Sequence, residues 1–253
     1  SGYNGAATSP ITIADYWIWK YANQTSLNLS CWQHIRRTGT ILPGEGFTMK
    51  GPGTGSIEAQ QNYVFSGKPN NGDINLSLVA NNDYLVGNPY PSAIDADLFI
   101  RDNGPEMLED GTPNPNGTPT ITGTLYFWKH WGGGSHTLND YDGGYAIYNL
   151  SGAVAAATKG SNNTAFNGEE LTEEAPGRYI PVAQGFFVIG EGGGDIKFNN
   201  NQRVFNIEES AEPQFFRATE VATSETIDAI DERMKFRIGF NSINTIHRQL
   251  LLT

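Results

Sequence analysis

Cysteine and histidine are scarce in this sequence, and each shortage excludes a class of structure. The chain has 253 residues, of which one is cysteine and four are histidine. Because Cys31 has no second cysteine to pair with, intrachain disulfides are excluded and core burial must stabilise the fold. Zinc sites need three or four ligands, and the widely spaced histidines do not supply them, so no zinc site is predicted.

Basic residues and long apolar runs are also lacking. Lys and Arg number 16 against 27 Asp and Glu, a net charge of −11. Such a surface does not attract phosphate backbones or anionic lipids, so nucleic acid and anionic membranes are not expected as partners. No run approaches the ~18 apolar residues of a membrane-spanning helix, so direct membrane insertion is not expected.

Residues 1–5 lack the features of a signal peptide, and the abrupt beginning and end favour a piece of a longer parent chain.

Turn-forming and aromatic residues are abundant instead. The chain contains 30 glycines and 13 prolines, and Phe, Trp and Tyr make up 11%. Glycine and proline indicate many turns, and short segments rich in aromatic and β-branched residues are typical of strands. The predicted strands are 15–21, 27–35, 40–50, 61–66, 73–79, 84–86, 124–131, 144–149, 178–189, 195–198, 203–206, 234–240 and 248–252. We therefore expect an all-β fold of two packed antiparallel sheets, a jelly-roll-like sandwich.

Three short segments recur in the same order along the chain, and this repeat predicts two related β units with long loops. The similar pairs are 17–21 with 126–130, 41–47 with 180–186, and 72–74 with 194–196. The predicted organisation is a first β unit at 1–100, a loop excursion at 101–123, a second β unit at 124–206, and an acidic linker with a closing strand pair at 207–253.

The stretch 85–100 begins as a strand and breaks at a Gly-Asn-Pro-Tyr-Pro sequence. Pro89 and Pro91 fix φ and push the residues before them toward extended geometry, which excludes a helix there. Ser92 is the expected cap of a short helix that follows. The stretch therefore predicts a rigid connection between two sheets.

Two acidic segments are candidate calcium sites, because calcium prefers several oxygen ligands from one loop. The first contains Asp95, Asp97 and Asp102, and the second, between two predicted strands, contains Asn139, Asp140 and Asp142. The plainer interpretation is that these are solvated or capping side chains. Calcium is thus a candidate cofactor with a structural role.

Aromatic residues in a glycine-rich loop are candidate sugar ligands, since rings stack on sugars and polar tips bond to hydroxyls. Trp131 lies beside three glycines, Tyr141 lies in an Asn-Asp-Tyr-Asp sequence, and His136 lies between them. The alternative is that Trp131 and Tyr141 cover the end of a sheet. The remaining tryptophans are predicted to be core: Trp17, Trp19, Trp32 and Trp128.

Several of these segments resemble a region of large exported proteins of Bacteroidota, especially flavobacteria. The segments that carry the resemblance are Leu42-Pro-Gly-Glu-Gly-Phe-Thr-Met-Lys-Gly51, Gly67-Lys-Pro-Asn-Asn-Gly72, Leu85-Val-Gly-Asn-Pro-Tyr-Pro-Ser-Ala-Ile-Asp95, Leu125-Tyr-Phe-Trp128, Gly144-Tyr-Ala146, Gln184-Gly-Phe-Phe187, Phe215-Phe-Arg217 and Arg248-Gln-Leu-Leu251. Such regions usually precede a sorting domain of the type IX secretion system, which this sequence lacks. The resemblance implies export across the outer membrane, to the cell surface or the medium, and supplies no catalytic residue.

The sequence therefore favours a non-catalytic module of a secreted or surface protein, with an adhesive, scaffold or spacer role. The alternative is a carbohydrate-binding module, and the partner is then a polysaccharide rather than a surface protein. No catalytic motif is present, so an enzyme is not predicted. A glycoside hydrolase stays open, because Glu45 lies in a tight Gly-Glu-Gly turn and other acidic residues are available, although its counterpart in the second unit is Gln184.

Overall fold

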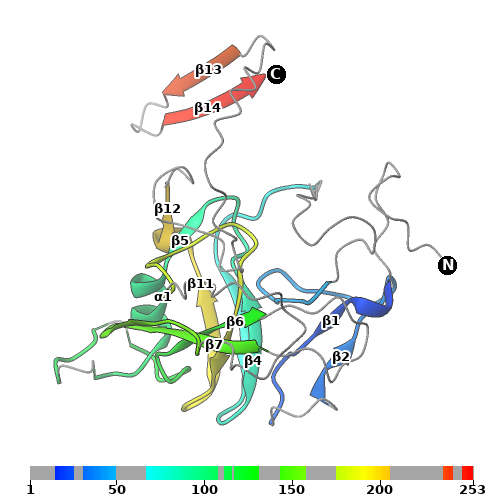
Figure 1. Ribbon diagram of the computed structural model, residues 1–253. Coiled ribbons are helices and arrows are strands. Elements are labelled where there is room, and N and C mark those ends of the chain that lie inside the picture. The colour runs from blue at the N-terminus through cyan, green and yellow to red at the C-terminus, as the bar shows by residue number, and fades with distance from the viewer. Residues whose placement is uncertain are drawn as a thin grey trace. The chain divides into compact units, whose positions relative to one another are not determined.

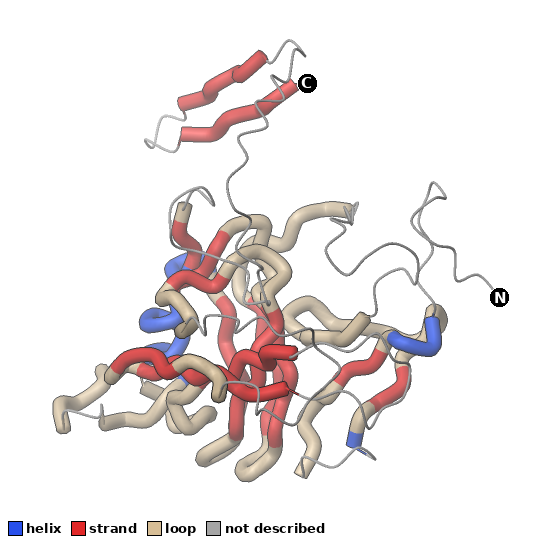
Figure 2. Tube along the Cα trace, in the orientation of Figure 1, coloured by secondary structure: helices blue, strands red, loops and turns tan. Residues whose placement is uncertain are grey.

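The computed structural model describes residues 15–25, 31–49, 67–107, 111–115, 117–130, 143–157, 175–205, 236–241 and 247–252. The chain divides into two compact units, Ser1–Glu220 and Val221–Thr253. Strands predominate among the described residues, and helix is limited to α1 and short 3-10 turns (Figures 1 and 2). The fold is all-β and sandwich-like, as the sequence predicts.

The described elements of the first unit alternate short strands with turns. They are η1 (Asp15–Trp17), β1 (Trp19–Lys20), β2 (Gln33–His34), β3 (Ile74–Leu78), β4 (Asp83–Gly87), β5 (Ala93–Asp95), α1 (Ala96–Asn103), β6 (Leu125–His130), β7 (Gly143–Asn149), β8 (Gly152–Val154), β9 (Tyr179–Ile180), β10 (Gly185–Ile189), β11 (Gly194–Phe198), η4 (Asn200–Gln202) and β12 (Arg203–Val204).

The largest sheet of the described residues has the antiparallel order β4-β10-β6-β7-β8. Smaller sheets have the orders β12-β5-β9, β11-β3 and β1-β2. Strands from both halves of the chain alternate in these sheets, since β4 pairs with β10 and β3 pairs with β11. The stretches predicted as first and second β units therefore share their sheets.

The main core lies between the inner face of the five-stranded sheet and a layer formed by β3, β11, β5 and α1. Aromatic contacts connect the layers: the Phe99 ring of α1 lies 5.4 Å from Phe186 of β10 and 5.0 Å from Phe198 of β11. Each of these rings is almost fully buried. Burial of one such side chain contributes about 1.5–3 kcal/mol to stability, so this group is a principal determinant of the fold.

The outer face of the same sheet is covered in part by the N-terminal segment. The Leu85 N–H of β4 donates to the Tyr21 carbonyl at 2.7 Å, so the backbone of this segment lies along the edge of β4. Leu85, Phe187 and Tyr21 form a second buried cluster, against which Trp32 and Cys31 pack. Three successive residues are buried in both β4 and β10, because these strands are covered on both faces.

The Gly-Asn-Pro-Tyr-Pro sequence is a rigid connection between two sheets, as predicted. It joins β4 of the five-stranded sheet to β5 of the β12-β5-β9 sheet. The buried Asn88 amide donates to the carbonyls of Ser92, Ile180 and Pro181 at 2.9–3.1 Å, and its oxygen accepts the Tyr90 N–H. One asparagine thus binds four backbone groups around the connection.

Helix α1 begins later than the sequence suggests. Asp95, and not Ser92, is the N-cap: its carboxylate accepts the N–H groups of Asp97 and Leu98. Ser92 is instead engaged by Arg203, whose Nε donates to its hydroxyl at 3.1 Å. The prediction of Ser92 was wrong because residues 93–95 pair as β5 before the helix starts.

The second unit contains the expected closing strand pair. Strands β13 (Phe236–Asn241) and β14 (His247–Leu252) pair antiparallel, with Phe236 opposite Leu252 and Asn241 opposite His247.

Candidate functional site: an exposed aromatic face

Most of the predicted ligand residues lie outside the described residues. These are Trp131, His136, Asn139, Asp140, Tyr141 and Asp142, all within the connection from β6 to β7. The glycan and calcium predictions for them therefore stay predictions. The strands on either side of this connection are described, and they show what the connection joins.

Asp95 and Asp97, the other predicted calcium ligands, lie at the start of α1 and bind protein groups. Arg178 donates from Nε and from one terminal nitrogen to the two Asp95 oxygens, at 3.0 and 2.7 Å. The same Nε lies 3.3 Å from Asp97, whose other oxygen accepts the Tyr148 hydroxyl at 2.7 Å. These hydrogen bonds raise the pKa of Arg178, and burial followed by the Asp97 contact raises the pKa of Tyr148. The network fastens β7 and the segment before β9 to the helix.

Asp102, considered with them, also has protein partners. Its carboxylate accepts the Asn199 amide and the Gln202 amide, both at 2.8 Å. Within the described residues, no three His, Cys, Asp or Glu side chains gather as a metal site.

Glu45, the candidate acid of the Gly-Glu-Gly turn, is buried with a complete set of partners. Lys20 Nζ lies 2.8–2.9 Å from both carboxylate oxygens. The Tyr84 hydroxyl and the Leu42 N–H also donate to it, at 2.9 and 2.7 Å. Burial, and then the hydrogen bond to Glu45, raise the pKa of Tyr84. The carboxylate therefore holds the turn against β1 and β4.

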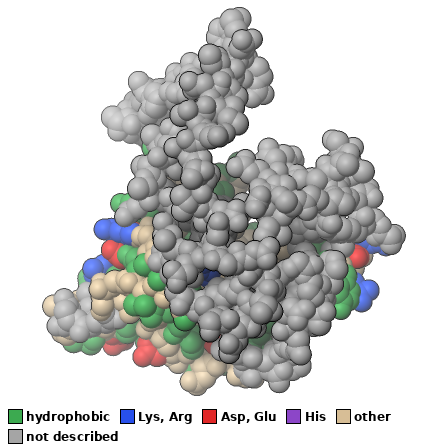
Figure 3. Space-filling model, viewed as in Figure 1, with side chains coloured by type: hydrophobic (Ala, Val, Ile, Leu, Met, Phe, Trp, Pro, Cys, Tyr) green, Lys and Arg blue, Asp and Glu red, His purple; other side chains and the backbone are tan. Residues whose placement is uncertain are grey.

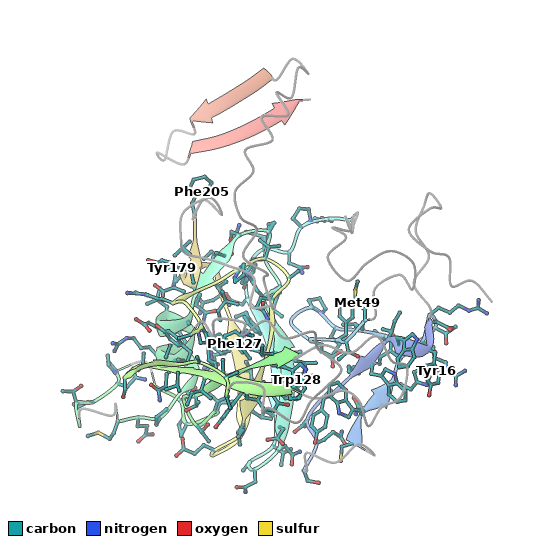
Figure 4. All side chains as sticks on the ribbon, in the orientation of Figure 1. Tyr16, Met49, Phe127, Trp128, Tyr179 and Phe205 are labelled. Carbon is teal, nitrogen blue, oxygen red and sulfur yellow. The ribbon has the colours of Figure 1, made fainter. Side chains whose placement is uncertain are left out.

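An exposed aromatic face is the feature best suited to bind a ligand. The side chains of β6 alternate, so that Leu125, Phe127 and Lys129 face the core and Tyr126 and Trp128 face outward. Trp128 is 41% exposed although the sequence suggests a core residue. The prediction was wrong because aromatic content alone does not distinguish the two faces of a strand. Figure 4 shows Trp128 on the β6 strand and the oppositely directed Phe127.

The Trp128 ring is held in place by its neighbours on β7. Trp128 lies directly opposite Tyr145, with ring centroids 5.0 Å apart and planes at 65°. A β-carbon at Gly143 would collide with the Trp128 indole, so the ring lies over the glycine. Gly143 therefore provides the room that this orientation of the indole requires.

The exposed rings continue the buried outer cluster. Tyr145 contacts Tyr126 at 6.4 Å and Phe187 at 6.0 Å, and Phe187 contacts Tyr21 of the covering segment. Burial raises the pKa of Tyr145, and the nearby Asp83 carboxylate raises it further, so its hydroxyl stays a donor at neutral pH. The exposed aromatic face on β6 and β7 is thus continuous with the buried ring of Phe187 on β10.

No helix of the described residues combines the length and hydrophobicity of a membrane span.

Comparison with known protein families shows that the chain belongs to the family of the domain of unknown function DUF8693, whose model matches residues 1–252. No curated protein matches the chain. No solved structure matches it either.

Proposed function

We propose that this member of the DUF8693 family is a non-catalytic carbohydrate-binding module of an exported bacterial surface protein. The observation that carries the proposal is the exposed Trp128 ring, held by Tyr145 and Gly143 on one face of the sheet. An indole face in a fixed orientation stacks on the apolar face of a sugar ring. Because the ring is already ordered, little side-chain entropy is lost on binding.

We call Trp128 with its supports Tyr145 and Gly143 the platform. The sequence on either side of the platform supports the same proposal. Trp131 follows Trp128 by three residues, and Tyr141 precedes Gly143 by two. The aromatic residues predicted to bind sugar thus belong to the connection between the two strands that form the platform. A calcium ion held by Asp140 and Asp142 would stabilise that connection.

A binding role is favoured over hydrolysis by the partners of the buried carboxylates. Glu45 is held by Lys20, and Asp95 by Arg178. A glycosidase needs two carboxylates that face one cleft and exchange protons with the substrate. Carboxylates fastened to cations and backbone N–H groups instead stabilise the fold.

The surface location is supported by the resemblance of the Gly-Asn-Pro-Tyr-Pro segment and its companions to exported proteins of Bacteroidota. An antibody against the chain, applied to cells of the source organism before and after external protease treatment, tests it. Loss of the signal from intact cells supports surface exposure. A signal that persists until lysis contradicts it.

Affinity electrophoresis in gels that contain neutral polysaccharides, with calcium and with chelator, tests the binding function. Retardation of the wild type that is lost in Trp128→Ala and largely kept in Trp128→Phe is the expected result. Phe205→Ala is the matched control, since Phe205 is a 93% exposed ring outside the platform. If no polysaccharide retards the wild type, the module is a scaffold or spacer whose partner is a surface protein.

A further inference from the structure

A second group of aromatic rings lies on the β1–β2 pair, at residues that the proposed platform does not use. Trp19 and His34 are opposite each other in the register, and their rings are stacked 3.9 Å apart at 5°. The Tyr16 ring stands perpendicular to both, 6.1 Å from Trp19 and 5.3 Å from His34. The three rings form a corner, and Tyr16 is 52% exposed beside β1 (Figure 4).

Two arginines adjoin this corner. Arg36 Nε donates to His34 Nδ1 at 3.3 Å, and Arg37 is the next residue; both are exposed. Neither arginine forms an ion pair within the part of the chain that the structure describes. Figure 3 shows basic side chains at the side where Figure 1 places β1 and β2. Two exposed positive charges, without an ion pair among the described residues, thus lie in the turn next to the rings, in a chain whose net charge is −11.

The turn that carries the arginines is held in a defined conformation. Arg36 has a φ of +55°, and the N–H of Gly39 donates to the Ile35 carbonyl at 2.9 Å. Ile35 is itself buried, and its N–H donates to the Ile18 carbonyl. The turn is therefore anchored to the strands that hold the rings, and the Arg36 guanidinium and the ring corner form one surface, with Arg37 exposed at the next position.

We propose that this surface is a second binding site, which takes an acidic polysaccharide of the uronic acid class. The sugar ring stacks on the exposed Tyr16, and the carboxylate accepts hydrogen bonds from the guanidinium groups of Arg36 and Arg37. Guanidinium groups bond to carboxylates with two parallel N–H donors, which fixes the sugar's orientation. A cationic ligand is disfavoured here, because the arginines repel it.

Polygalacturonate and its fully methyl-esterified form test the proposal, because they share a backbone and differ in carboxylate charge. Binding of each to the full chain is measured by affinity electrophoresis at low and high salt. We expect polygalacturonate to bind, and an Arg36→Gln/Arg37→Gln double variant to bind it about tenfold more weakly, as does wild type at high salt. Tyr16→Ala weakens binding and Tyr16→Phe retains it, since the ring is the contact.

The outcomes separate this site from the sheet platform. Trp128→Ala leaves polygalacturonate binding unchanged if the corner is the site. If Trp128→Ala abolishes that binding and the double arginine variant does not, the inference is wrong and the proposed function stands. The inference is also wrong if wild type binds the esterified polymer as tightly as polygalacturonate, and the double arginine variant binds it as tightly as wild type does. Circular dichroism of each variant establishes that it is folded.

Discussion

Gly44 and Ala183 occupy equivalent positions in two tight turns that lie against β4, and both have a positive φ, +88° and +62°. In each turn the next residue, Glu45 or Gln184, donates its N–H to the carbonyl three positions earlier, at 3.0 and 3.3 Å. One turn bridges to β4 and the other leads into β10, which pairs with β4. The repeated segment of the sequence therefore has a repeated backbone conformation on both sides of one strand.

The two positions predict opposite effects of exchanging glycine and alanine. Ala183→Gly removes the strain of a left-handed alanine, which exceeds the entropy that glycine adds to the unfolded chain, so we expect a gain of about 0.5 kcal/mol. Gly44→Ala introduces that strain and places a β-carbon 3.2 Å from both Leu76 and Phe198, so we expect a loss of about 1–3 kcal/mol. Urea unfolding measures both. A Gly44→Ala variant as stable as wild type would contradict the prediction.

The buried ion pair of the first turn predicts a large loss when one partner is neutralised. Glu45→Gln leaves Lys20 without its counter-charge, although 18% of the Lys20 side chain reaches solvent. We expect a loss of about 2–4 kcal/mol of unfolding free energy. Lys20→Met combined with Glu45→Leu is the control, and it should recover part of the loss because no buried charge remains. Equal stability of Glu45→Gln and wild type in guanidinium would refute this account.

Asp95 has two roles that substitutions can separate. Asp95→Asn keeps an N-cap acceptor but loses the ion pair with Arg178, whose side chain is 47% exposed. Because solvent screens that pair, we expect a loss of only about 1 kcal/mol. Asp95→Ala also loses the cap, which adds about 1 kcal/mol. Urea unfolding at low and high salt measures both losses. High salt should narrow the stability difference between wild type and each variant, and should leave the difference between the two variants unchanged. Identical losses for the two variants would show that the cap contributes nothing.

Residue patterns predicted the strands better than their pairing. The alternation in β3 and the apolar runs of β4 and β10 could be recognised locally, because they reflect burial on one face or on both. That β10 pairs with β4, 98 or more positions away in every matched pair, depends on which surfaces are complementary after the chain has folded. The Ser92 cap failed for the same reason, since β5 forms only when β9 and β12 are present.

The exposed aromatic face of β6 and β7 was not predicted from the sequence, and the predicted sugar ligands lie outside the described residues. An aromatic sugar platform was expected at Trp131 and Tyr141, and Trp128 was assigned to the core. The signal that could have found Trp128 is the alternation of β6, in which Leu125 and Phe127 mark the inner face. Gly143 could not have been found, because its role depends on which ring of the neighbouring strand lies over it in the folded sheet.

Tyr90 predicts a loss of stability at alkaline pH. Burial, and then the Asp73 carboxylate, raise the pKa of Tyr90 to about 12 from an ordinary 10.0, while the Arg203 charge lowers it. The phenol also donates to the Gly72 carbonyl at 2.6 Å. Because the pKa of Tyr90 is higher in the folded chain than in the unfolded chain, the protonated phenol contributes to stability. This contribution to the unfolding free energy is complete below about pH 10 and is lost as the pH rises through about 12.

Thermal melts between about pH 9 and pH 12 measure this effect, with near-ultraviolet absorbance reporting tyrosinate. Tyr90→Phe is the control: it lacks the hydrogen bond at every pH, so its stability should fall less steeply over the same range. A wild-type protein whose melting temperature declines in parallel with that of the variant would show that Tyr90 is not responsible.

The close approach of Gly143 to the Trp128 indole predicts that a substitution at Gly143 disrupts the platform without removing the indole. In Gly143→Ala the new β-carbon takes the place of the Trp128 indole and also meets the Lys129 carbonyl, so the ring must move. We expect polysaccharide retardation to fall about tenfold, and the near-ultraviolet circular dichroism of tryptophan to change. Gly185→Ala is the matched control, because Gly185 lies in β10 of the same sheet and its β-carbon would find only ordinary contacts at 3.5 and 3.6 Å. If Gly143→Ala binds as wild type while its tryptophan signal changes, the orientation of Trp128 does not determine binding, and another surface must hold the sugar.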